Sequence, residues 1–303
     1  MATETQSQTA QSTDRSFADR IDAWLAEDMS PKRALAVYAV IGVYMTFLLL
    51  PVAYMVLATF TSADFLYSPR LVPALGDLTL QNYVSILSTG LFQQYFINST
   101  IVATSTTLLT LVVGTLAAYS LSRFEYPGRN TLLFSFLGTQ MLPRVLILIP
   151  FFLVMFSLSL IDSLLGIVIA HSVLGIPLGT WLLKGYFDDI PKSLDEAAKM
   201  DGCSHLDILW RIIIPMSLPG ITVAGFYTFI LSWNDFLFVS ILSQTAATRT
   251  LPFGLQLFQS QNTVAWELLL TAATITMIPV VVLFAVFQRW VVEGLATGGM
   301  KGT

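Results

Sequence analysis

The chain has 303 residues, of which 55% are hydrophobic and only 11% are charged, and its formal net charge is −4. This composition, with a mean hydropathy of +0.72, excludes a soluble globular domain and is typical of integral membrane proteins. A transmembrane helix needs about 20 mostly apolar residues, and the long charge-free stretches supply six such segments. The sequence therefore predicts an all-α integral membrane protein with six transmembrane helices.

Residues 1–33 are predicted to form a cytoplasmic tail. Residues 1–16 are rich in Thr, Ser and Gln and lack an apolar run, which is typical of a disordered segment and unlike a signal peptide. Phe17, Ile21, Trp24 and Leu25 then recur at helical spacing among acidic residues, which predicts a short amphipathic helix. This helix could brace the membrane surface or simply lead into the first span.

Residues 34–303 form the predicted transmembrane domain. Its six spans are expected at 34–60, 98–122, 131–160, 164–183, 219–243 and 268–288. The third span contains Pro143, Arg144 and Pro150, so we expect it to be kinked or tilted. The segment 61–97 is long enough for a small external cap, with an interfacial helix at 80–87.

The basic residues predict the orientation, because Lys and Arg are retained in cytoplasmic loops. With the amino terminus inside, twelve of the fifteen fall in cytoplasmic segments, Arg70 and Arg249 fall outside, and Arg144 falls within a span. Both termini are therefore predicted to be cytoplasmic, in agreement with an even number of spans. The loop between the fourth and fifth spans then faces the cytoplasm.

The chain offers little for covalent or metal chemistry. Cys203 is its single cysteine, so neither an intramolecular disulfide nor a zinc site of several cysteines can form. His171 and His205 fall in different compartments. The sequence has no phosphate-binding loop, H-E-x-x-H or G-x-S-x-G motif. We expect no catalytic residue and no bound metal or cofactor; an intramembrane hydrolase would need a serine linked to His171 by a motif, and none is present.

The loop at 196–215 is polar and helix-forming, in contrast to its apolar flanks. Ser193 with Glu196 and Ser204 with Asp207 fit two capping boxes, which predicts helices at 194–200 and 206–213. Gly202 between them offers a left-handed helix stop.

Two further features of this loop are the end of its second helix and the surface of its first. Pro215 and Pro219 are expected to end the second helix before the fifth span. Ala197 and Ala198 give the first helix a face of small residues that a partner can approach closely. A short cytoplasmic helix with such a face is typical of a docking element.

The loop resembles the signature of permease subunits of binding-protein-dependent ABC importers, in which E-A-A, three residues, G, nine residues and I-x-[LI]-P follow one another. The matching residues are Glu196, Ala197, Ala198, Gly202, Ile212, Ile214 and Pro215. Other stretches, among them Phe96-Ile97-Asn98-Ser99 and Trp233-Asn234-Asp235-Phe236, are similar to the second permease of the maltose-type pair. The resemblance runs from about residue 34 to the end.

The resemblance implies a permease subunit of an ATP-driven importer for a sugar or oligosaccharide, in the cytoplasmic (inner) membrane of a prokaryote. The implied partners are a second permease in a heterodimer, a dimer of ATP-binding subunits, an extracellular solute-binding protein, the sugar and the lipid bilayer, with no nucleic acid. ATP and Mg would be used by the partner ATPase, so this chain would not be an enzyme. The residues implied in coupling to the ATPase are Glu196, Ala197, Ala198, Asp201, Gly202, Ile214 and Pro215.

Polar and aromatic residues within the spans are candidates for the substrate pathway. Arg144 would cost about 2.5–3.5 kcal/mol at the centre of a bilayer, so it should face the bundle interior, a wet cavity or the interface, in a pathway or a structural role. Asn234 and Asp235 could bind sugar hydroxyls or tie helices together. Tyr227 and Trp233 could stack on sugar rings or lie at the lipid interface.

The alternative function is a secondary transporter driven by an ion gradient. Such a transporter needs titratable groups within the membrane. The predicted spans offer only Asp235 and His171 for that purpose.

Overall fold

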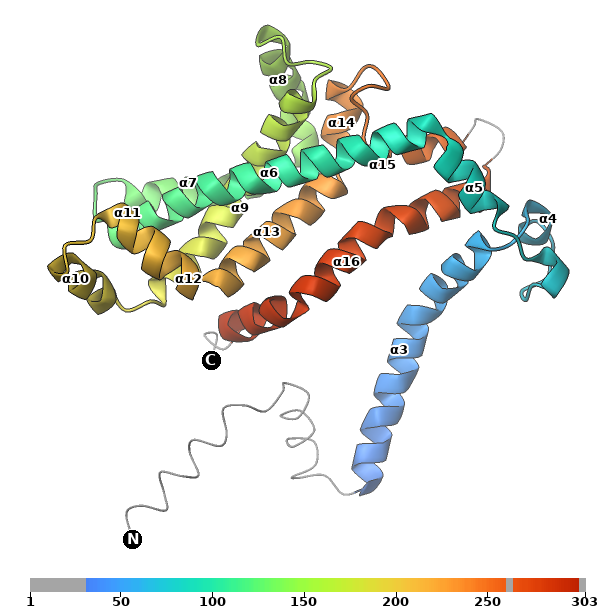
Figure 1. Cartoon of the computed structure of the whole chain (residues 1–303), viewed down its shortest axis with the longest axis horizontal. Helices are drawn as coiled ribbons and strands as arrows, with labels where there is room; N and C mark the ends of the chain where they lie inside the picture. Colours follow the sequence, from blue (N-terminus) through green and yellow to red (C-terminus); the bar gives the residue numbers. More distant parts are fainter. Residues whose placement is uncertain (1–30, 260–263, 300–303) are drawn as a thin grey trace. The chain divides into compact units, whose positions relative to one another are not determined.

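The computed structural model describes residues 31–259 and 264–299, so the predicted tail helix lies outside the described residues. Within these ranges the secondary structure is helical, and extended pairing is limited to the isolated bridges Thr61 with Leu78 and Gln259 with Val264 (Figure 1). The all-α prediction is confirmed. The chain divides into two units, Met1–Leu57 and Ala58–Thr303.

The first unit contains most of α3 (Pro31–Thr59), which corresponds to the first predicted span. Its segment Ala34–Thr59 has a mean hydropathy of 2.2, high enough to cross a bilayer. Pro51 lies inside the helix without ending it, as is common in membrane helices, where neighbouring groups can satisfy the freed carbonyl.

The segment after α3 contains α4 (Ala63–Leu66), the 3-10 turn η1 (Leu75–Asp77) and α5 (Gln81–Ser88). The helix predicted at 80–87 is α5. Asn82 is buried and its Nδ2 donates to the carbonyls of Thr59 (3.0 Å) and Thr61 (2.8 Å). One amide side chain therefore fixes the segment against the start of α5.

The core of the second unit is formed by α6 (Gly90–Arg123), α9 (Leu164–Asp188) and α13 (Leu218–Trp233), which pack side by side, and by α16 (Trp266–Gly299) against α13 (Figure 1). A Cβ added to Gly175 of α9 would lie 3.0 Å from Thr110 Oγ1 of α6 and 3.1 Å from Thr228 Cγ2 of α13. Small residues let membrane helices approach closely because packing, rather than exclusion from water, drives their association. Gly175 therefore allows the three helices to meet.

The third predicted span is not one helix. It consists of α7 (Arg129–Gln140) and α8 (Arg144–Ser157), which are bent by 104° at the intervening residues. Pro143 precedes α8 in an extended conformation and has no N–H to donate, which explains a break there rather than the expected kink. Pro150, in contrast, lies inside α8.

The fifth predicted span is also broken, into α13 and α14 (Leu237–Leu242). Asp235 Oδ1 accepts a hydrogen bond from the backbone N–H of Phe238 (2.9 Å), so its side chain starts α14. Asn234 and Asp235 thus lie at a break and not inside a continuous helix. A short helix α15 (Leu251–Gly254) and the 3-10 turn η3 (Leu255–Phe258) follow before α16.

Four single helices in the described residues are long and apolar enough to cross a membrane, namely Ala34–Thr59, Gly90–Arg123, Leu164–Asp188 and Trp266–Trp290. Two bent pairs raise this number to as many as six. One is α7 with α8; the other joins His205–Met216 to Leu218–Trp233 at an angle of 81°. The chain is therefore a multi-pass membrane protein of the predicted class.

Candidate functional site: a two-helix loop on the ends of the core helices

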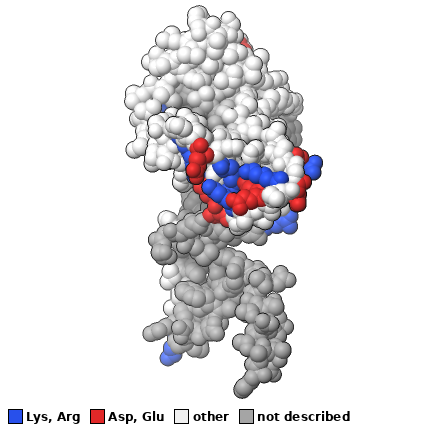
Figure 2. Space-filling view, turned by 90° about the vertical axis from the view of Figure 1, so that its left-hand side faces the viewer, with Lys and Arg blue, Asp and Glu red and all other residues white. Residues whose placement is uncertain are grey.

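The loop between α9 and α13 contains α10 (Lys192–Met200), α11 (His205–Ile208), a π-helical turn η2 (Leu209–Ile213) and α12 (Ile214–Met216). It lies at one end of the core helices (Figure 1). Figure 2 shows that Lys, Arg, Asp and Glu gather at this end, while the rest of the described surface in that view is nearly free of them. The loop therefore forms the charged end of an otherwise apolar surface in this view.

The first helix, α10, begins at Lys192 with Pro191 as its N-cap, so the capping box predicted from Ser193 and Glu196 is wrong. A proline before the helix already fixes the backbone and leaves Ser193 inside the first turn. The helix stop is as predicted: Gly202 has φ +84°. Its N–H donates to Lys199 O, and that of Cys203 donates to Ala198 O, both at 3.0 Å, which is a Schellman motif.

The second capping box is confirmed. The backbone N–H of Asp207 donates to Ser204 Oγ, and that of Ser204 donates to Asp207 Oδ2, both at 3.2 Å. The hydrogen bond from the Ser204 hydroxyl, its backbone N–H and the nearby Arg211 hold the pKa of Asp207 below its usual value. The carboxylate therefore stays ionised at the start of α11, where the helix dipole favours it.

Pro215 does not end the second helix, which continues through the π turn to Met216. Pro215 cannot donate to the carbonyl of Arg211, and its ring crowds that carbonyl. The wider turn at Leu209–Ile213 relieves this conflict without a break. The break comes at Ser217, and Pro219 lies in the first turn of α13.

Apolar packing fixes the loop on the core helices. Ala198, Ile208, Leu209 and Ile213 of the loop belong to one buried cluster. Its members from the core helices are Ala118 and Tyr119 of α6, Leu183 and Phe187 of α9, and Ala224 of α13. The loop is thus in contact with all three central helices.

An ion pair joins the loop to α6. Asp195 Oδ2 of α10 lies 2.9 Å from Arg123 Nε, and the two side chains are only 9% and 5% exposed. Neither Arg123 nor Asp195 was among the site residues predicted from the sequence. The available signal was the spacing of Asp195 and Ala198, which places both on one side of α10.

The predicted coupling residues divide between two faces of the loop. Glu196, Ala197, Asp201, Gly202 and Pro215 are exposed, Ile214 is partly buried, and Ala198 is buried in the cluster. The prediction that Ala197 and Ala198 share a docking face is wrong, because consecutive residues point about 100° apart on a helix. Met200, which was not predicted, is 88% exposed and adds an apolar side chain to the outer face.

Two of the five pathway candidates make contacts inside the protein. Trp233 is 1% exposed; its Nε1 donates to Thr276 O of α16 (3.1 Å) and its ring stacks on Phe229. Asp235 is buried and its Oδ1 lies 3.2 Å from His171 Nε2. His171 Nδ1 in turn lies 2.8 Å from Ser232 Oγ. Both candidates therefore hold the end of α13 in place.

The other three candidates differ in exposure. Arg144 and Asn234 are exposed, and Tyr227 is partly buried against the cluster that contains Leu231.

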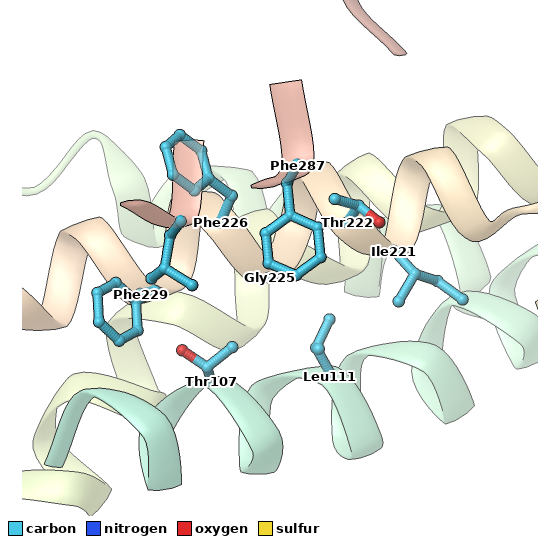
Figure 3. Close-up of a pocket in the computed structure, with 9 residues that line it drawn as sticks. Thr107, Leu111, Ile221, Thr222, Gly225, Phe226, Phe229 and Phe287 are labelled. Carbon is cyan, nitrogen blue, oxygen red and sulfur yellow. The ribbon is translucent and has the colours of Figure 1, made fainter. Parts of the chain in front are cut away.

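A cavity of about 230 Å³ lies between α6, α13 and α16 (Figure 3). Its wall includes Phe226, Phe229 and Phe287 together with Thr107 and Leu111, and it contains none of the five pathway candidates. Such an apolar wall offers few hydrogen-bonding groups to a sugar.

Helices that can cross a membrane, with a charged two-helix loop packed on their ends, define a multi-pass membrane protein. Residues 110–297 match the family described as "Binding-protein-dependent transport system inner membrane component", and the chain belongs to this family. Its place is therefore the inner membrane, as a component of a transport system that works with a binding protein.

The relatives agree over most of the chain. The inner membrane ABC transporter permease protein YcjP of Escherichia coli (strain K12) is 34% identical over 88% of this chain and 95% of its own length. The trehalose/maltose transport system permease protein MalG of Thermococcus litoralis is 34% identical over 84% of this chain and 92% of its own length.

A solved structure shares the fold. It is a chain of a bacterial ABC transporter involved in the import of the acidic polysaccharide alginate, with 23% identity and a TM-score of 0.75 over 91% of this chain and 99% of that chain.

Proposed function

We propose that this chain is a permease subunit of an ATP-driven importer that moves a sugar or oligosaccharide across the cytoplasmic membrane. The observation that carries this proposal is the loop, whose outer face is open at Glu196, Ala197 and Met200 while its inner face is packed on three core helices. The names of relatives for trehalose/maltose and maltodextrin transport support a sugar as the substrate.

In this proposal α10 enters a cleft of a separate ATPase subunit. ATP and Mg are bound by a dimer of that subunit and not by this chain. A second permease completes a heterodimer, and an external solute-binding protein delivers the sugar. Both termini lie in the cytoplasm, on the side of the charged loop.

The packing of the loop explains how ATP use would reach the membrane. Because Ala198, Ile208 and Ile213 are in one cluster with residues of α6, α9 and α13, a displacement of α10 must move the ends of these helices or break that cluster. Rigid, closely packed elements transmit small shifts in this way. The coupling roles fall to the exposed Glu196, Ala197, Asp201, Gly202 and Pro215, with Ala198 and Ile214 supporting them from behind.

The exposure of the pathway candidates separates those that could contact a sugar from those that could act only indirectly. Arg144 and Asn234 are exposed and therefore available to a passing sugar, whereas Tyr227 is only partly exposed. Trp233 and Asp235 act on the pathway through the shape of the break between α13 and α14.

The proposal is tested by isolating the protein from its native membranes. The tagged chain is solubilised gently, and the co-purified proteins are identified by mass spectrometry. We expect a second permease, an ATPase with Walker motifs and a solute-binding protein. Recovery of the chain alone from several detergents, with the ATPase present in the same membranes, would contradict the proposal.

A variant locates the docking face in the same experiment. Ala197→Arg places a long charged side chain on the outer face of α10 and should abolish recovery of the ATPase. Ala74→Arg, at an exposed alanine of the external segment, is the matched control and should leave recovery unchanged. Uptake that persists after ATP is depleted while the ion gradient is intact would favour the secondary transporter instead.

A further inference from the structure

The buried ion pair between Arg123 and Asp195 is the feature from which we argue beyond the docking of α10. Arg123 is the last residue of α6 and Asp195 lies in the first turn of α10. Nε and Oδ2 are 2.9 Å apart, and both side chains are less than a tenth exposed. Buried charges are costly to desolvate and are retained only with close partners. A pair of this kind at the edge of the docking helix therefore needs an explanation.

Arg123 also holds the backbone that enters α10. Its Nη2 donates to the carbonyl of Ile190 at 3.0 Å, one residue before the N-cap Pro191. One guanidinium thus contacts the chain on both sides of the start of α10. A planar guanidinium with several donors is suited to such a role, whereas a lysine ammonium lacks the fixed geometry.

The neighbouring residue extends the connection to α9. Ser122 Oγ donates to Asp188 Oδ1 at 2.7 Å, and Lys184 pairs with the other oxygen of Asp188. The end of α6, the end of α9 and the start of α10 are therefore joined by polar contacts as well as by the apolar cluster.

The other lysine and arginine ion pairs among the described residues are more exposed. The side chains of Arg211 and Asp207 are 74% and 38% exposed, and those of Arg70 and Asp77 are 52% and 17% exposed. Exposed pairs are weak because water screens them. Compared with these arginine pairs, that of Arg123 with Asp195 is strongly buried and also links two helices that are far apart in the chain.

We infer that Arg123 is a positioning residue for coupling, which fastens α10 to the cytoplasmic end of α6 so that the two helices move as one body when the ATPase moves α10. Apolar contact through Ala198 resists a push of α10 toward the core. The directional contacts of Arg123 resist a pull or a slide as well. This inference rests on the proposed function.

The test measures the distance between α10 and α6 in the intact complex. Spin labels are placed on Lys199→Cys, at the flank of α10 outside the face of Glu196, Ala197 and Met200, and on Leu116→Cys of α6, both of which replace exposed side chains, in a Cys203→Ala background. The complex is studied in lipid nanodiscs before and after trapping with Mg-ATP and vanadate. With Arg123 intact, we expect one narrow distance distribution that is the same in both states.

In the Arg123→Gln variant we expect the distribution to broaden or shift on trapping by about 5 Å, the rise of one helical turn. Arg123→Lys keeps the charge and should give a smaller change. Arg70→Gln, which breaks an exposed arginine–aspartate pair of similar length, is the matched control and should behave as the unmodified protein. A merely structural role would lower the yield of the complex without changing the distance in complexes that assemble.

Identical distributions for Arg123→Gln and the unmodified protein in assembled complexes would overturn the inference. If Arg123→Gln does not assemble, Arg123→Lys and Asp195→Asn carry the same measurement. Failure of the unmodified chain to recover any ATPase would instead refute the proposed function, so the two failures are distinct.

Discussion

Asn98 connects the N-terminal part of α6 to the loop between α14 and α15. It is 1% exposed, and its Nδ2 donates to the carbonyls of Ala247 (2.9 Å) and Arg249 (2.8 Å). Gln94 Nε2 donates to its Oδ1 at 3.0 Å, which fixes the orientation of the amide. Replacement of this side chain leaves two carbonyls without their donor.

Each buried polar group that loses its partner costs about 1–3 kcal/mol, so Asn98→Ala, which leaves two carbonyls without a donor, should lower the free energy of unfolding by about 2–6 kcal/mol. Asn98→Asp has nearly the same shape but presents carboxylate oxygen to the two carbonyls, and its loss should be at least as large. Unfolding in a detergent titration measures both. Protection of the amide hydrogen of Leu251, which donates to Ser99 Oγ, should fall in parallel because the same loop is released.

Asn130→Ala removes an exposed asparagine of α7 and is the control, with an expected change within about 0.5 kcal/mol. If Asn98→Asp were as stable as the unmodified protein, the two carbonyl contacts could not be what holds the loop on α6.

Three further outcomes follow from other contacts. Gly202→Ala forces a Cβ into a backbone with φ +84° and should destabilise the end of α10 by about 1 kcal/mol, seen as faster hydrogen exchange at Cys203; exchange that is unchanged would contradict the left-handed stop. Hydrogen bonds from the Thr248 hydroxyl, and then from residues 244 and 245, lower the pKa of Asp162 from 3.8 to about 2. The stabilisation of the folded loop by the Asp162 carboxylate is therefore complete above pH 3.8 and is lost as the pH falls through about 2. Limited proteolysis at residues 243–250 should therefore increase over that pH window in the unmodified protein and be independent of pH in Asp162→Asn. Asp235→Asn weakens both the contact with His171 and the start of α14, and should cost about 1–3 kcal/mol in a detergent unfolding titration; a variant as stable as the unmodified protein would show that the break does not depend on this carboxylate.

Sequence reasoning was most successful where local chemistry decides the structure. The apolar runs predicted α3, α6, α9 and α16 because length and hydropathy alone determine what a bilayer accepts. The Ser204 and Asp207 box and the stop at Gly202 were predictable because both depend on residues within one turn.

It failed locally at one point: Ser193 with Glu196 fits a capping box, but the nearby Pro191 already begins α10. The other failures occurred where neighbours far along the chain decide the structure. The orientation of Ala198 toward the core depends on Ile208 and Phe187, which no local pattern reveals. The spacing of Asp195 and Ala198 places both on one side of α10, but the burial of that side depends on Arg123 and the core helices.

The two faces of α10 have different freedom to change over evolutionary time. Substitutions at Glu196, Ala197 or Met200 alter only the surface offered to a partner, whereas substitutions at Asp195 or Ala198 disturb contacts with the core. A permease built in this way can change the exposed surface of α10 through a few substitutions while the packing of its membrane helices stays the same.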